Sequence, residues 1–108
     1  MDTYYEYKLA PADTFEPRSV VAEAIENGCD ALLFDDGALP PAFFDLSSGI
    51  AGDLLHRLSV YQMRMAAVVA NPAAHSPRFQ EFMLEANKGR AYRFFPQRDA
   101  AIRWLAAE

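Results

Sequence analysis

Apolar residues along the chain alternate between short continuous runs and segments with helical spacing. The runs predict strands, and in the first of them Tyr5, Tyr7 and Leu9 share one face at a spacing of two residues. The runs at 31–34 and 65–70 are continuous, which is typical of strands buried on both faces. The predicted strands span residues 4–9, 31–34, 65–70 and 91–95.

Between these runs, apolar residues recur three or four positions apart, which predicts amphipathic helices. Pro17 suits the first turn of one helix, Asn27-Gly28 suits its end, and Ser76-Pro77 suits the start of another. The predicted helices span residues 17–27, 47–60, 77–87 and 98–106.

Strands and helices therefore alternate strictly, with short connections between them. Such an order requires right-handed crossovers and a mainly parallel sheet. We predict one α/β domain over residues 1–108, since a chain of 108 residues buries a single core. We expect four or five strands in a mainly parallel or mixed sheet, about four helices, and the strand at Ala66–Val69 in its centre.

Composition agrees with a globular fold, because 52% of the residues are hydrophobic and 23% are charged. One cysteine and two histidines do not suffice for a disulfide framework or a closed zinc site, so we predict no metal and no cofactor. No apolar run approaches the roughly 20 residues that span a bilayer, and the first residues do not resemble a signal peptide. We expect a cytoplasmic protein that binds no membrane.

Charge is distributed unevenly along the sequence. Residues 1–54 carry eleven acidic and two basic side chains, whereas residues 55–108 carry eight basic and four acidic ones. The net charge of −5 repels phosphate backbones, which excludes general nucleic-acid binding. The asymmetry, together with the tyrosine-rich first strand, suggests a homodimer that associates edge to edge. Scattered surface charge explains the same counts.

The segment 43–52, Phe-Phe-Asp-Leu-Ser-Ser-Gly-Ile-Ala-Gly, combines a loop with the start of a helix. Backbone N–H groups and the helix dipole favour an anion at such a position. Candidate phosphorylation or partner-contact residues share this loop: Asp45, Ser47, Ser48, Gly49 and Gly52. In the simpler interpretation, Ser47 or Ser48 is an ordinary N-cap.

This segment resembles the Asp-Ser-Ser-Gly-Leu-Gly loop of anti-sigma-factor antagonists, the STAS domains, with one extra residue between Asp45 and the serines. In that family the loop follows a central strand and opens a helix. The serine before the first glycine is phosphorylated there by a partner kinase, and Ser48 matches it. The resemblance implies a STAS-like fold and a regulatory role.

A closer resemblance covers about residues 20–107. It is to a family of small bacterial proteins of unknown function with a Phe-Phe-Asp-Leu-x-x-Gly-x-Ala-Gly core, which here starts at Phe43. The matches continue at Tyr61, at the apolar strand 66–69 and at Phe82-x-x-Glu85-x-Asn87-Lys88-Gly89. That family is similar to STAS domains in its element order and implies no known activity.

Other polar groups offer alternatives. Asp35 and Asp36, which follow a predicted strand, could hold magnesium with Asp45, but we favour a solvated acidic turn. Glu85, Asn87 and Lys88 form a candidate polar rim for a ligand or partner, or a plain helix end.

We therefore interpret the chain as a non-enzymatic regulatory or protein-interaction module whose contact surface is the loop 45–52. The alternative is a small-ligand binder or enzyme with a pocket near Asp35, Asp45 and Ser48. A third interpretation is an oligomeric subunit of a larger assembly. We predict no catalytic residues, since the sequence contains no phosphate-binding glycine loop and no nucleophile–base pair at a recognised spacing.

Overall fold

The structure, a computed structural model, describes residues 4–8 and 14–107. The strands are β1 (Tyr5–Tyr7), β2 (Ala31–Phe34), β3 (Arg64–Val68) and β4 (Tyr92–Phe95). The helices are α1 (Pro17–Glu26), α2 (Ile50–Val60), α3 (Pro77–Ala86) and α4 (Arg98–Ala106). Short 3-10 turns lie in the connections, namely η1 (Pro41–Phe44), η2 (Leu46–Ser48) and η3 (Pro72–Ala74). The predicted alternation of strands and helices is confirmed.

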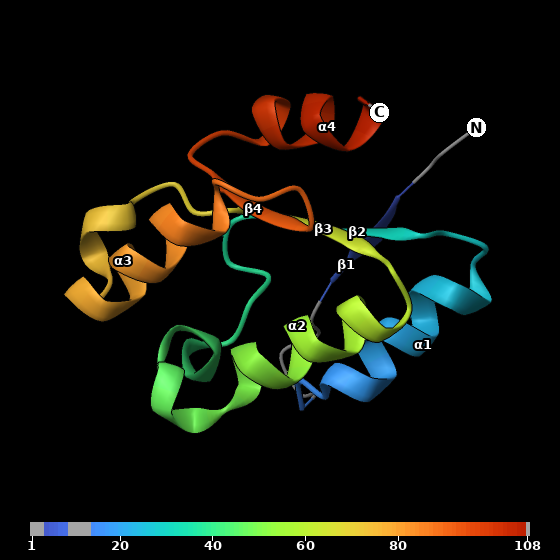
Figure 1. The fold of residues 1–108 in the computed structure, drawn as a ribbon, viewed down its shortest axis with the longest axis horizontal. Helices are drawn as coiled ribbons and strands as arrows, with labels where there is room; N and C mark the ends of the chain where they lie inside the picture. The colour runs from blue at the N-terminus through green and yellow to red at the C-terminus, as the bar shows by residue number, and fades with distance from the viewer. Residues whose placement is uncertain (1–3, 9–13, 108) are drawn as a thin grey trace.

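The strands of the described residues form one parallel sheet in the order β1-β2-β3-β4. Each new strand is added on the same side of the previous one, so every right-handed crossover places its helix on the same face. Accordingly, α1, α2 and α3 pack on one face, and α4 covers the other (Figure 1). The four parallel strands agree with the prediction of four or five strands in a mainly parallel or mixed sheet. The strand β3 lies inside the sheet, as expected.

Burial on both faces explains why the inner strands have no polar alternation. Leu32 and Phe34 of β2 belong to the core under α1, α2 and α3, whereas Ala31 and Leu33 belong to the core under α4. In β3, Met65 and Ala67 face the three-helix layer, whereas Ala66 and Val68 face α4. All four residues of β2 are buried, so an apolar side chain is required at each of them.

Some predicted boundaries change. Residues 47–49, predicted to open the second helix, instead form the end of η2 and a left-handed residue at Gly49. The strand predicted over 65–70 starts at Arg64 and ends at Val68. Leu9, placed in the first predicted strand, lies outside the described residues. None of the helices within residues 4–8 and 14–107 has the length and apolar character to cross a bilayer.

The outer edge of β4 is covered by a side chain. The amide of Asn87 accepts from the backbone N–H of Phe94 at 2.7 Å and donates to the Phe94 carbonyl at 3.1 Å. One side chain thus satisfies the donor and the acceptor that a further strand would have paired. Covered edges resist pairing with other chains.

Val68→Asp should prevent folding, because it places an unpaired charge against α4 at a side chain that is 6% exposed. Val60→Asp is the matched control, since Val60 is 64% exposed. Circular dichroism melts of both variants test this. A Val68→Asp protein with the melting curve of the wild type would contradict the two-sided core.

Candidate functional site

The connection between β2 and α2 is the candidate site. It leaves the inner strand β2 at its carboxyl end, forms η1 and η2, and leads directly into α2 (Figure 1). Its residues 43–52 are those that sequence patterning and resemblance singled out.

Phe43 anchors this loop in the core. Its side chain is fully buried, and its ring centroid lies 6.0 Å from that of Phe79 in α3 and 6.5 Å from that of Phe94 in β4. The ring pairs fall within the range of favourable aromatic contacts. Burial of a phenylalanine side chain contributes about 1.5–3 kcal/mol, so the loop is fixed at its base.

Phe44 joins the loop to the connection after β3. Its ring stacks on the imidazole of His75, with centroids 4.0 Å apart and planes 13° apart, and lies 5.0 Å from the ring of Phe79. The two connections therefore support each other at the carboxyl end of the sheet. This pair could not be predicted from sequence, because Phe44 and His75 lie in different connections and no local pattern relates them.

The turn at Asp45 is held by its own carboxylate. Asp45 Oδ1 accepts a hydrogen bond from the backbone N–H of Ser47 at 3.1 Å and another from Ser47 Oγ at 2.6 Å. Both residues are exposed. Asp45 caps η2, which gives it a local structural role as well as a place on the surface.

Ser48 is exposed just before α2, and its hydroxyl group makes two contacts. Ser48 Oγ donates to the carbonyl of Ala42 at 2.6 Å and accepts from the backbone N–H of Ile50 at 3.3 Å. We expected Ser47 or Ser48 at the N-cap of α2, but Gly49, with φ 81°, occupies that position. A glycine tolerates this left-handed conformation without strain.

The surface around Ser48 is open on the helix side. A Cβ atom at Gly49 or at Gly52 would meet no other heavy atom within 4 Å. Gly52 is exposed in the first turn of α2. No side chain therefore covers the backbone on this face, and the structure brings together the predicted residues Asp45, Ser47, Ser48, Gly49 and Gly52.

The acidic turn after β2 is occupied by internal contacts. Asp35 Oδ2 lies 2.8 Å from Arg98 Nη1, and Asp35 Oδ1 accepts from the backbone N–H of Asp36. Asp36 Oδ1 accepts from the backbone N–H of Ala70 at 3.1 Å. Within residues 4–8 and 14–107, no group of three or more histidine, cysteine or acidic side chains is placed to hold a metal ion.

Arg98, the first residue of α4, connects three parts of the chain. Its guanidinium group binds both carboxylate oxygens of Glu6, at 2.6 and 2.9 Å, in addition to Asp35. The hydrogen bond from Arg98 lowers the pKa of Glu6, against the opposing effect of desolvation. The same pairing raises the pKa of Arg98. No local sequence pattern predicts this network, because Arg98 lies 63 and 92 residues away from its two partners.

The candidate polar rim lies elsewhere. Glu85 and Lys88 form an exposed ion pair at the end of α3, with Nζ and Oε2 3.1 Å apart. Ser48 precedes the start of α2, and helices of such a layer run antiparallel to the strands, so the two groups lie at opposite ends of the helical layer. The structure does not bring them together. Asn87 of this group is the residue that covers the edge of β4.

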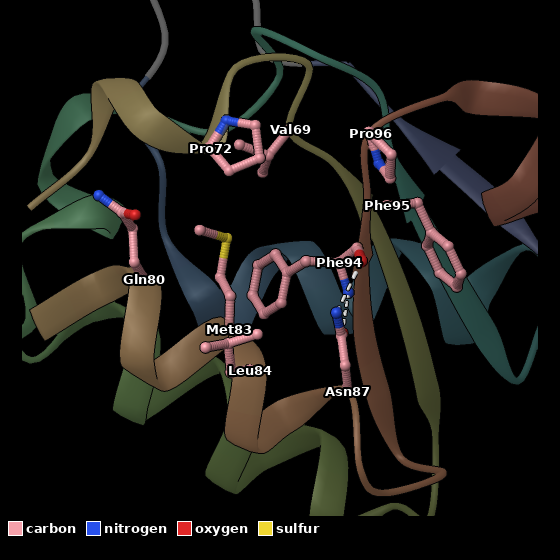
Figure 2. A pocket seen from close by; sticks show the side chains of 9 residues that line it. All are labelled: Val69, Pro72, Gln80, Met83, Leu84, Asn87, Phe94, Phe95 and Pro96. Carbon is pink, nitrogen blue, oxygen red and sulfur yellow. Dashed lines mark hydrogen bonds between the residues drawn. The ribbon is translucent and has the colours of Figure 1, made fainter. Parts of the chain in front are cut away.

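An apolar hollow of about 230 Å³ lies between α3 and the outer edge of β4. Figure 2 shows Met83 of α3 and Phe94 of β4 pointing into it, with Pro72 and Pro96 near its upper rim. Asp35, Asp45 and Ser48 are not among its lining residues. The predicted pocket near Asp35, Asp45 and Ser48 is therefore not this hollow, which lies apart from the loop 45–52.

The chain belongs to the family described as "Domain of unknown function (DUF4180)", whose model matches residues 12–105. No curated protein and no solved structure matches the chain. The description of this family names no activity, so the match gives the chain a family but no biochemical role.

Glu6→Gln should lower the free energy of unfolding by about 1 kcal/mol at neutral pH, because the ion pair with Arg98 is partly exposed. Since the folded state lowers the pKa of Glu6 below its ordinary 4.5, this stabilisation is complete above pH 4.5. It disappears as the pH falls through the lowered pKa.

Urea unfolding of both proteins across that pH range measures the difference. Glu26→Gln is the control, because Glu26 is exposed and makes no ion pair within the described residues. A difference between wild type and Glu6→Gln that stays constant down to acid pH would contradict the role of the pair.

Proposed function

We propose that the chain is a non-enzymatic regulatory module of STAS-like type, which binds a protein partner through the loop 45–52 and is controlled by phosphorylation of Ser48. One observation carries the proposal. Ser48 is an exposed residue just before α2, beside open backbone at Gly49 and Gly52, on a loop that Phe43 anchors in the core. A kinase requires a reachable hydroxyl, and a partner surface requires a fixed shape.

The position of the loop supports the resemblance to STAS domains. It follows β2, which lies inside the sheet, and it opens a helix. The elements after it come in the same order as in that family: strand, helix, strand and helix.

Phosphorylation of Ser48 would act on the contacts of its hydroxyl group. The ester oxygen has no hydrogen to donate, so the 2.6 Å bond to the Ala42 carbonyl would be lost. The phosphoryl group adds about 1.5–2 negative charges. The start of α2 favours these charges, whereas the nearby carboxylate of Asp45 disfavours them. The loop would then change both its charge and its attachment to η1.

The proposal is tested by affinity capture from the native host with four baits: wild type, Ser48→Ala, Ser48→Asp and the control Ser19→Asp. Ser19 is exposed in the first turn of α1, far from the loop in sequence. We expect one protein to be captured by wild type, Ser48→Ala and Ser19→Asp, and lost from Ser48→Asp.

Intact-mass measurement of the protein isolated from the same host should show one added phosphoryl group, absent from Ser48→Ala. Equal capture by Ser48→Asp and wild type, together with unmodified mass, would overturn the proposal.

Thermal melts separate a switch from a structural serine. Ser48→Ala and Ser48→Asp both lose the bond to Ala42, so each should cost about 1 kcal/mol, while Ser48→Thr keeps the hydroxyl. A switch requires Ser48→Ala to retain partner binding despite this cost. Loss of binding in both variants in proportion to their stability would indicate that Ser48 only supports the loop.

We also propose that two copies associate edge to edge. The edge that would pair is β1, the terminal strand opposite β4, since Asn87 covers the outer edge of β4 at Phe94. Sedimentation equilibrium at low and high salt should show a dimer of moderate affinity that weakens as salt screens the charges. A monomer at high micromolar concentration in both salts would contradict the association.

A further inference from the structure

A second hollow, of about 540 Å³, lies at the amino end of the sheet beneath the end of α4. Its lining combines starts of strands with the last turn of a helix: Asp30, Arg64, Arg90, Arg93, Trp104, Leu105, Ala106 and Ala107. Its volume falls within the range of small-ligand sites. It shares no residue with the loop 45–52.

Trp104 packs with Arg64 and Arg93 in the lining of this hollow. The guanidinium carbons of Arg64 and Arg93 lie 5.2 and 5.4 Å from the centre of the Trp104 ring, within cation–π distance. Arg64 donates to the carbonyl of Leu105 at 2.8 Å, at the end of α4 where the partial negative charge of the helix favours a cation. Arg93 Nε donates to the carbonyl of Gly89 at 2.7 Å. Backbone acceptors thus fix both guanidinium groups.

Within residues 4–8 and 14–107, the arginines of this hollow have no carboxylate partner. Among the described residues, the ion pairs are made by other basic side chains, Arg57, Lys88 and Arg98. Asp30 lines the hollow but makes none of these pairs. In a chain with more acidic than basic residues, three guanidinium groups that form no ion pair among the described residues give this hollow a local positive charge.

We propose that this hollow binds a phosphate monoester group of a small molecule. Among the described residues that line the hollow, three guanidinium groups stand against one carboxylate, which suits a doubly charged oxyanion, and guanidinium forks suit phosphate oxygens. The guanidinium groups of Arg64 and Arg93 already lie over the ring of Trp104. A ligand would therefore be recognised by N–H donors and not by stacking of a base on this ring. The net charge of −5 disfavours a nucleic-acid backbone.

Trp104 is the only tryptophan of the chain, so its fluorescence reports on this hollow. Full-length protein is titrated with inorganic phosphate and with glycerol 3-phosphate, and chloride keeps the ionic strength constant. We expect a saturable change in emission with both probes and tighter binding of the ester. Saturation by inorganic phosphate alone, with no response to the ester, would overturn the monoester assignment.

Arg90→Gln and Arg93→Gln should each weaken binding about tenfold, the loss expected for one charge-assisted contact. Arg90 makes no hydrogen bond or ion pair within residues 4–8 and 14–107, so its substitution removes charge without removing an internal contact. Arg78→Gln is the matched control, because Arg78 is exposed in α3 and does not line the hollow. It should bind as wild type does.

Two results would overturn the proposal. One is the absence of any saturable change with either probe. The other is equal binding by wild type and Arg90→Gln, because the charge of the hollow would then play no part.

Discussion

Burial of the inner strands on both faces is the constraint on which the rest of the structure depends. Every residue of β2 is buried, as are Met65–Val68 of β3, and the described residues include no buried polar or charged side chain. Polar side chains therefore lie at the ends of the sheet, on its edge strands and on the outer surfaces of the helices.

Strand order decides what the carboxyl end can offer. Open parallel sheets bind ligands in a crevice where the strand order reverses. Here the order never reverses, so α1, α2 and α3 lie on one face and no such crevice opens. Arg98 instead closes this end by bridging Glu6 and Asp35. At this end of the sheet the loop before α2 exposes Asp45, Ser47 and Ser48.

The elements of the fold could be predicted from sequence because each depends on local spacing. The continuous run 31–34 and the Ser76-Pro77 start of α3 are local patterns, and Ser76 caps as expected by accepting from Phe79 N–H. The start of α2 was misplaced because Ser47, Ser48 and Gly49 are all plausible at a helix start, and only the left-handed backbone at Gly49 decides between them.

Residues that work over long distances could not be predicted in the same way. The guanidinium of Arg98 meets a carboxylate 92 residues away, and Arg64 reaches the end of α4 across 41 residues. Such pairs follow from the packing of α4 on the sheet, which a periodic pattern does not encode. The candidate residues around Ser48 could be identified because they are contiguous in sequence.

The two ends of the sheet differ in how their arginines are used. Arg98 at the carboxyl end pairs with two carboxylates, whereas Arg64 and Arg93 at the amino end contact carbonyl oxygens and the face of Trp104 among the described residues. A carbonyl oxygen carries only a partial charge, so it orients a guanidinium group without cancelling its charge. The first arrangement fastens β1 and α4 together. The second leaves oriented positive charge beside a hollow, which is the arrangement that favours an external anion.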